Sequence, residues 1–337
     1  MLPKREILAR ALDCSGVGRA LRSWGSWRGL VVLNYHRIGD CRATPLDPGV
    51  FSATVDEFDR QLGWLKNHAD VISLEDVDRA LAEPQRRSVL ITFDDGYRDN
   101  FELAAPLLAS HGLRAAFFIT TGFLDERPLA WWDEISWLVK HAARRRLPDR
   151  PDLFDRCALG WRPGEETDAI RSVLAAYKSL PAPAADRLID ELAAATETAR
   201  PSPGLIDPWM TWDMVRELAA AGHAIAAHTV THPLLGRCDL DRQAHEIRGS
   251  KARLEGQLGS PVLGFSYPVG IPGSYSDDTA RLVREAGFRW AFSFQGGYAD
   301  TRQPAPPDRY RLPRIAIETG LSEPQFRALH TLPQLFA

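Results

Sequence analysis

Short apolar segments alternate with longer amphipathic segments over most of this chain. Seven apolar segments, each rich in β-branched or aromatic residues, predict strands: 29–35, 89–93, 115–120, 223–227, 262–267, 290–294 and 312–317. The segments between them have helical periodicity, and several end at glycine, as helices commonly do: 51–68, 104–111, 213–221, 242–258 and 276–287. Strands that alternate with helices predict an α/β fold with a parallel sheet, and about seven such units suit a closed or nearly closed barrel.

One part of the chain departs from this alternation. Residues 132–208 have a helical pattern, are rich in Ala, Arg and Pro, and contain no convincing strand. We interpret them as a helical insertion beside or over the barrel mouth, which either shapes substrate access as a cap or only packs against the barrel. The rest of the chain then divides into an N-terminal helical segment over 1–28, the barrel over 29–320 and a tail over 321–337.

Composition and charge narrow the class of protein. The 337 residues are 45% hydrophobic and 25% charged, which is ordinary for a soluble globular protein. A formal net charge of -3 is too small to indicate nucleic acid as a partner. The four cysteines show no paired spacing, so we expect reduced thiols rather than a disulfide framework or a zinc–cysteine site.

The N-terminal segment bears on where the protein acts. No apolar segment approaches the roughly 20 residues that a membrane span requires, and no signal peptide is visible, so we expect a cytoplasmic protein without a membrane span. Residues 5–24 could form a basic amphipathic helix that rests on the inner face of the membrane, or a helix that only packs on the domain. Peripheral membrane contact therefore stays open.

Polar side chains follow several of the predicted strands. Asp94 and Asp95 end the strand that begins at Val89, and His228 follows directly after the segment 223–227. In α/β barrels the carboxyl ends of the strands carry the active site. The polar residues at these ends are Tyr35, His36, Asp94, Asp95, His228, Tyr267, Pro268 and Arg314.

Two aspartates and two histidines predict a metal centre. One carboxylate and two imidazoles form a three-ligand set that leaves one position open for water, as in catalytic zinc sites. His228 and His232 are four residues apart, which puts both imidazoles on one side of a single helical turn. Adjacent strand residues point to opposite sides, so Asp94 and Asp95 cannot both bind one ion in the same way. We expect one of them to be a ligand and the other to act as a base on the bound water.

Three segments resemble the first three motifs of a known family. Thr92–Gly96, His228–His232 and Phe265–Gly270 are similar to those of the polysaccharide deacetylases, also called the NodB-homology domain or carbohydrate esterase family 4. The resemblance covers about 30–317 apart from the insertion, and it implies a distorted (β/α)7 barrel with Asp94 as the catalytic base. The metal, usually Zn²⁺ or another divalent transition metal, would have three ligands: Asp95, His228 and His232.

The chain differs from this family at two points. The third motif lacks the arginine that commonly steadies the base, and Arg314 on the last predicted strand could serve instead. The last motif lacks the histidine that often acts as general acid. Tyr35-His36 resembles the N-terminal motif of the poly-N-acetylglucosamine deacetylase branch, where the histidine is thought to take the place of the acid. His36 is therefore the candidate acid, with a structural histidine as the alternative.

The resemblance implies hydrolysis of the N-acetyl, or another N-acyl, group of an amino sugar in a polysaccharide or its lipid-linked precursor. Candidate residues for binding this N-acetylated carbohydrate, each of which could also be a core residue, are Tyr97, Tyr267, Pro268, Trp131, Trp132 and Trp290. Two other functions stay open. The protein could be a catalytically inert carbohydrate-binding protein on the same fold, or an amidohydrolase that acts on a non-sugar amide such as a cyclic imide.

Overall fold

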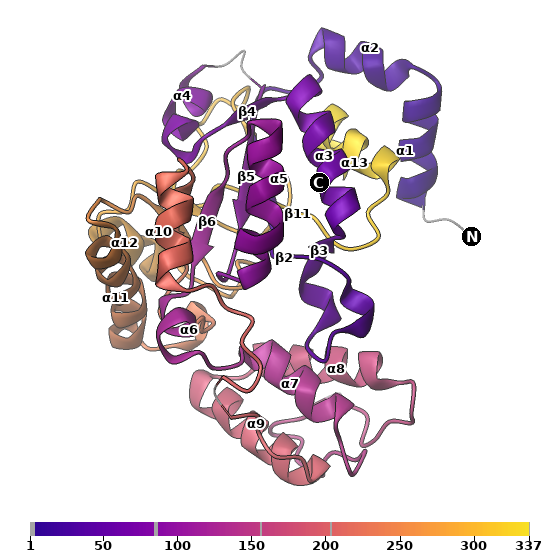
Figure 1. The fold of residues 1–337 in the computed structure, drawn as a ribbon, viewed down its shortest axis with the longest axis vertical. Coiled ribbons are helices and arrows are strands. Elements are labelled where there is room, and N and C mark those ends of the chain that lie inside the picture. The colour runs from indigo at the N-terminus through magenta and orange to yellow at the C-terminus, as the bar shows by residue number, and fades with distance from the viewer. Residues whose placement is uncertain (1–3, 84–86, 156, 203, 337) are drawn as a thin grey trace.

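The computed structural model describes residues 4–83, 87–155, 157–202 and 204–336. Its centre is a curled sheet whose neighbouring strands are parallel, with β10 as an antiparallel addition at one end (Figure 1). The strands follow the order β10, β1, β5, β6, β7, β8 and β9. Their bounds are β1 Gly29–Tyr35, β5 Arg87–Phe93, β6 Ala116–Ile119, β7 Ala224–Ala227, β8 Gly264–Ser266, β9 Trp290–Phe292 and β10 Ala299–Asp300.

The last predicted strand joins the two ends of this sheet. β11 (Ile315–Ala316) pairs in parallel with β1, and Leu312 forms a parallel bridge with Phe292 of β9. The seven predicted strands are therefore present as a distorted (β/α)7 barrel, as the sequence predicted. Four short strands were not predicted: β10, β4 (Asp70–Ile72), which pairs with β5, and the pair β2 (Arg37–Ile38) and β3 (Phe51–Ala53).

Helices cover the outside of the sheet (Figure 1). They are α3 Val55–His68, α4 Val77–Ala82, α5 Ala105–His111, α6 Thr121–Glu126, α10 Trp212–Ala220, α11 Leu240–Leu258 and α12 Asp277–Glu285. The helix predicted from residue 51 begins only at Val55. Thr54 and Glu57 explain this start, because each side chain accepts a hydrogen bond from the backbone N–H of the other, which forms a capping box.

The predicted insertion is helical and lies at one end of the molecule (Figure 1). It contains α7 (Trp131–Lys140), α8 (Glu166–Ser179) and α9 (Ala182–Thr196), and α7 packs against both of the others. Their buried apolar residues, among them Ile170, Leu188 and Leu192, belong to the same core as the outer face of the barrel. The insertion is thus fixed to the barrel by a continuous apolar interior.

The N-terminal and C-terminal helices lie side by side (Figure 1). α1 (Lys4–Cys14) and α2 (Val17–Trp24) pack against α13 (Glu323–Thr331), which α14 (Pro333–Phe336) follows. The segment 5–24 is therefore two helices, because Gly16 adopts a left-handed backbone conformation with φ 73° between them. Among the described residues, no helix is both long and apolar enough to cross a membrane.

Alternation along the strands divides the core in two. Leu30 and Val32 of β1 point into the barrel, where they join Leu90 and Phe118 in one apolar cluster. The intervening residues of β1, such as Val31, belong to the larger cluster under the outer helices. Every second residue of a strand points to the same side, so Asn34, Thr92 and Asp94 also point inward. They lie at the carboxyl ends of β1 and β5, directly above the apolar interior.

Candidate active site

A cavity of about 550 Å³ opens where the carboxyl ends of the strands meet the insertion. Its base carries the polar residues Asn34, Asp94, Asp95, His228, His232 and Arg314. One wall is the segment 47–52, and the facing wall comes from α7 and α8. The side chains of α8 that line the cavity are spaced along one helix face: Thr167, Ile170, Arg171, Leu174 and Lys178.

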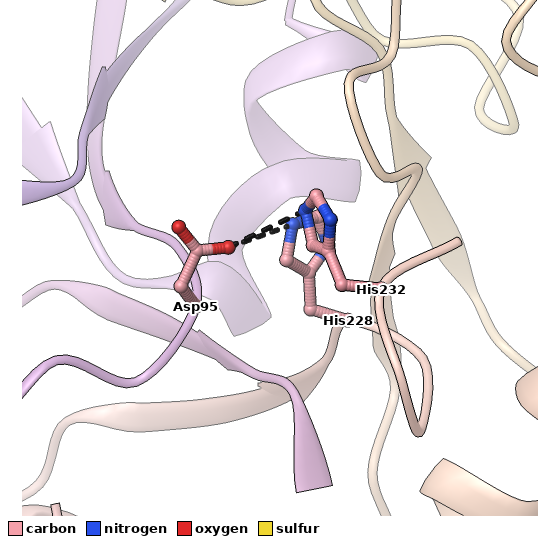
Figure 2. Close-up of side chains that lie close together, drawn as sticks. All are labelled: Asp95, His228 and His232. Atoms are coloured by element: carbon pink, nitrogen blue, oxygen red, sulfur yellow. Dashed lines mark ion pairs between the residues drawn. The ribbon is translucent and has the colours of Figure 1, made fainter. Parts of the chain in front are cut away.

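The three predicted metal ligands come together at the base of this cavity (Figure 2). Asp95 Oδ1 lies 3.5 Å from His228 Nε2 and 3.4 Å from His232 Nε2. All three side chains are buried, and their candidate ligand atoms lie within 4.8 Å of one another. Asp95 follows β5, whereas both histidines follow β7, so two adjoining loops supply the set.

The loop that carries both histidines differs from the expected helical turn. Thr229 and His232 adopt left-handed backbone conformations, with φ 68° and 57°, which non-glycine residues rarely do. The carboxylate of Glu246 on α11 accepts hydrogen bonds of 2.8 Å from the N–H groups of Val230 and Thr231. Thr229 Oγ1 accepts a third, of 3.0 Å, from the His232 N–H. These contacts stabilise the strained loop and turn both imidazoles to one side.

The chemistry of these three side chains fits a divalent metal. Asp95 Oδ1 is buried and has no hydrogen-bond partner among the described residues. Burial, together with the charges of Asp94 and Asp133, raises the pKa of Asp95 well above its usual value. His228 Nδ1 lies 2.8 Å from the Ser266 carbonyl oxygen, so this nitrogen carries the proton and Nε2 presents a lone pair toward Asp95. A cation at this point would compensate the buried carboxylate, and these ligand types suit Zn²⁺.

Asp94 lies beside this set, with Oδ2 3.7 Å from His228 Nε2, and Arg314 holds it there. The guanidinium donates two parallel hydrogen bonds, from Nη1 to Oδ1 at 2.8 Å and from Nη2 to Oδ2 at 2.7 Å. Burial alone would raise the pKa of Asp94, but the charges of Arg314 and His228 hold it below its usual value. Asn34 Oδ1 and Ser266 Oγ accept further hydrogen bonds from Arg314, at 2.9 and 2.7 Å. Asp94 is therefore an ionised carboxylate in a fixed orientation.

His36 lies on the same cavity, directly after β1. Its backbone is fixed at both ends, because its N–H donates to Ser52 Oγ at 2.9 Å and its carbonyl accepts from Asn100 Nδ2 at 2.6 Å. Burial lowers the pKa of His36 to about 4, although the charge of Asp94 opposes the shift. The imidazole is thus neutral at pH 7, and its role as an acid stays a prediction.

Comparison with known proteins identifies the family. Residues 82–147 and 153–291 match the family model described as polysaccharide deacetylase. The chain belongs to the polysaccharide deacetylase family. YxkH of Bacillus subtilis (strain 168), which is named as a polysaccharide deacetylase, is 20% identical over 276 residues, or 81% of this chain and 68% of YxkH. The poly-β-1,6-N-acetyl-D-glucosamine N-deacetylase of Staphylococcus aureus (strain MSSA476) is 29% identical over 118 residues, 32% of this chain and 41% of that protein.

Solved structures of deacetylases share the fold. The deacetylase PplD of Streptococcus pyogenes, in complex with acetate, has a TM-score of 0.57 at 20% identity, over 90% of this chain and 98% of PplD. IcaB from Ammonifex degensii has a TM-score of 0.54 at 18% identity, over 91% of this chain and 97% of IcaB. These likenesses support the deacetylase barrel that the strand order describes.

The predicted carbohydrate-binding residues divide into two groups. Trp131, Trp132 and Tyr267 line the cavity of this polysaccharide deacetylase. The Trp132 ring lies edge-on to His232, with centroids 4.7 Å apart, and Trp131 stacks on Tyr177 at 4.3 Å. Both tryptophans come from the first turn of α7, so the insertion reaches the candidate metal ligands. Contact with a sugar stays a prediction for these three residues.

Three of these predictions need correction. Trp290 is completely buried in the apolar interior of the barrel, with its indole N–H donating to Asp78, so it cannot stack on a sugar. Tyr97 is also completely buried, and its hydroxyl donates to Asp133 Oδ2 at 3.1 Å. Pro268 is buried and does not line the cavity. These roles were predicted from residue type alone. The position of each side chain in the structure shows that it does not line the cavity.

Several residues of the site were not predicted. Asn34 and Ser266 orient Arg314, and both follow the alternation that points every second strand residue inward. That alternation is a signal that could have found them. Asp133 and the cavity face of α8 come from the insertion, and the sequence contains no signal that places them at the barrel mouth.

Proposed function

We propose that this protein is a metal-dependent hydrolase that removes the N-acetyl group from an amino sugar in a polysaccharide or its lipid-linked precursor. The observation that carries the proposal is the pairing of an ionised Asp94, held by Arg314, with the adjoining set of Asp95, His228 and His232. Family membership supports the reaction class. The name of the Staphylococcus aureus relative supports an N-acetylated amino sugar as the substrate.

Each residue of the site has a defined part in the proposed reaction. Asp95, His228 and His232 would hold the ion, which when bound supplies a Lewis acid for the amide carbonyl and lowers the pKa of water. Asp94 accepts a proton from the water that attacks the carbonyl, because Arg314 keeps this carboxylate ionised and fixes its direction. Trp131 and Trp132 line the space that the sugar would occupy.

The proton for the departing amine is assigned to His36. This imidazole lines the same cavity as Asp94 and follows directly after β1. Because its pKa is lowered to about 4, it must take up a proton before it can donate one. A neutral resting imidazole next to an ionised Asp94 is consistent with one proton passing between these groups during turnover.

The alternative of a catalytically inert carbohydrate-binding protein rested on the absence of two family residues, the arginine of the third motif and the histidine of the last motif. Arg314 now occupies a position against the base, which removes the first of these arguments. The buried carboxylate of Asp95 and the strained histidine loop also favour an active site over a passive sugar-binding surface.

Acetate release from N-acetylglucosamine oligomers tests the proposal, with zinc-loaded protein and Asp94→Asn as the matched control. We expect release by the wild type, and a loss of several orders of magnitude in the variant at unchanged metal content. Activity that persists in Asp94→Asn would assign the base to another residue. No release from protein shown to hold one metal per chain would contradict deacetylation of this sugar.

A further inference from the structure

The first helix of this chain is attached to the protein partly by polar side chains. Glu6 is buried and accepts a hydrogen bond of 2.8 Å from Ser322 Oγ at the start of α13. Asp13, two turns further along α1, pairs with Arg327 Nη1 at 3.1 Å. A helix that only packs on a domain turns its apolar side inward. On α1 the inward side is mixed, because Glu6 and Asp13 share it with the completely buried Ala9 and the half-buried Leu12.

Four large apolar side chains of the N-terminal helices face solvent. Ile7 and Leu8 on α1 are 55% and 46% exposed, and Val17 and Trp24 on α2 are 47% and 82% exposed. They are four of the eleven exposed large apolar side chains among the described residues. Exposed apolar side chains gathered in this way mark a surface that another body covers. We call this patch, formed by α1 and α2, the N-terminal surface.

Cations surround the N-terminal surface. Residues 4–28 carry six lysine and arginine side chains and two acidic ones, a formal charge of +4 in a chain whose net charge is -3. Lys4, Arg5 and Arg19 are exposed beside the apolar side chains. Both acidic residues are engaged, Glu6 with Arg10 and Asp13 with Arg327, so neither offsets the exposed cations at the surface.

A cationic recess adjoins α2. It has a volume of about 560 Å³, and its lining residues come from α1, α2, α3 and α13 as well as from the turn between α1 and α2. Three guanidinium groups but only one carboxylate line it, and Trp64 and His68 stack on each other at its wall, with centroids 4.8 Å apart. The lining residues are Asp13, Gly16, Arg19, Arg22, Ser23, Trp64, His68 and Arg327. Arginine side chains in this number suit a phosphate group.

We propose that the N-terminal surface docks on a bilayer that contains anionic lipids, with the apolar side chains at the level of the headgroups and a lipid phosphate in the cationic recess. Exposed apolar residues, an exposed tryptophan and flanking cations are the features of helices that lie in a membrane interface. Charge argues against a second copy of the chain as the occupant, because a symmetric contact would bring one cationic patch against an identical one. The surface lies away from α7, α8 and α9, so docking leaves the insertion uncovered (Figure 1).

Co-sedimentation with lipid vesicles tests this proposal on the full chain. We expect binding to vesicles of phosphatidylcholine with phosphatidylglycerol, weaker binding to phosphatidylcholine alone, and release as salt is raised. Trp24→Ser should lower the affinity roughly tenfold, since it removes the largest exposed apolar side chain. Replacing Lys4, Arg5 and Arg19 together by glutamine should lower it about 100-fold, at roughly fivefold per cation.

The matched control is Leu205→Ser, which removes an apolar side chain that is 63% exposed elsewhere on the molecule. It should bind vesicles as the wild type does. Circular dichroism and acetate release should be the same in all of these variants, because none of the changed residues lines the active-site cavity. Equal binding by Trp24→Ser and wild type, or binding independent of phosphatidylglycerol, would overturn the proposal. So would a dimer in light scattering that Trp24→Ser dissociates, because the surface would then be an interface between copies of the chain.

Discussion

Asp94 and Arg314 depend on each other although they are 220 positions apart in the chain. Both are buried, and each would be an unpaired charge inside the barrel without the other. Removing one partner of a buried ion pair typically costs about 3–5 kcal/mol, because the remaining charge stays desolvated. Through the same two hydrogen bonds this pair stabilises the fold and, in the proposed reaction, keeps the base ionised and oriented.

The first prediction concerns this pair. Arg314→Met should lower the free energy of unfolding by about 3–5 kcal/mol in urea denaturation, and the double variant Arg314→Met/Asp94→Asn should recover most of the loss. Arg311→Met is the control, since Arg311 forms exposed ion pairs, and it should change stability by less than about 1 kcal/mol. A double variant as unstable as Arg314→Met would show that lost packing, rather than an unpaired charge, causes the effect.

His330 gives stability a dependence on pH. It is buried on α13, its ring nitrogens have no hydrogen-bond partner among the described residues, and burial lowers its pKa to about 3. In the unfolded chain its pKa is about 6.5, so between these values the unfolded state binds more protons and stability falls as the pH is lowered.

The second prediction follows from that difference. Between pH 7.5 and 5.5 the wild type should lose about 1.4 kcal/mol more stability than His330→Leu, which lacks the titrating group. Denaturation of both proteins at the two pH values measures this. If the difference in free energy of unfolding between the two proteins is the same at both pH values, His330 takes up its proton in the folded state as readily as in the unfolded state.

Helix α7 connects the insertion to the active site through one carboxylate. Asp133 Oδ1 accepts from the Asp47 N–H at 2.9 Å, and Oδ2 accepts from the Tyr97 hydroxyl at 3.1 Å. The Trp132 indole donates to the same Tyr97 oxygen at 2.8 Å. One side chain thus holds α7, a cavity wall and the turn after β5 together.

Asp133→Ala should therefore destabilise the protein and disturb the site. It leaves two buried donors without an acceptor, at about 1–3 kcal/mol for each, and loosens Trp132 beside His232. We expect a lower free energy of unfolding and a higher KM. Asp133→Asn keeps an acceptor for the Asp47 N–H, so its free energy of unfolding and its KM should lie between those of the wild type and Asp133→Ala. If Asp133→Ala changes stability but leaves KM unaltered, α7 supports the fold without positioning substrate.

Substitutions in helix α8 can test whether the insertion is a cap that shapes substrate access or only packs against the barrel. Leu174 lines the cavity, whereas Leu159 of the insertion is exposed and does not. Leu174→Trp should narrow the cavity and raise KM for N-acetylglucosamine oligomers roughly tenfold, while Leu159→Trp should not. Steady-state kinetics of both variants provide the comparison. A KM of Leu174→Trp equal to that of Leu159→Trp would indicate that the substrate does not contact α8.

The sequence predicted the larger elements because their signals are local. β-branched apolar segments gave the seven barrel strands, and Thr54 with Glu57 contains a capping signal that could have corrected the start of α3. β2, β3, β4 and β10 have three residues or fewer and lie outside the seven apolar segments, so no periodicity marks them. The N-terminal segment was expected to be one helix, and Gly16 was the overlooked break.

The sequence predicted those residues of the candidate site that belong to the family motifs. Asp94, Asp95, His228 and His232 end strands, so topology alone brings them to one rim. Trp290 and Tyr97 were assigned to the substrate by residue type, which does not indicate whether a side chain faces the cavity or the core. Asp133 lies in an insertion whose docking depends on packing among its own helices, and no local pattern encodes that contact.

Metal binding should be visible in the stability of the entire chain. An ion that binds only the folded state at 100 times its Kd adds about 2.7 kcal/mol to the free energy of unfolding. We expect Zn²⁺ to raise the melting temperature of chelator-treated protein, and His232→Ala to abolish this shift. Cys238→Ser controls for zinc bound by thiols and should keep the shift. A shift that survives His232→Ala would place the ion elsewhere.

Closure of the barrel also has a consequence for biosynthesis. The segment 312–316 supplies both the final strand pairing and Arg314. During translation the loops that carry Asp95, His228 and His232 leave the ribosome at least 80 residues before this segment does. A nascent chain can therefore carry all three candidate metal ligands while Asp94 still lacks its cation. With Asp94 as the proposed base, catalytic competence arises only after residue 314 has been added, and we expect prematurely terminated chains to be inactive even with these three ligands intact.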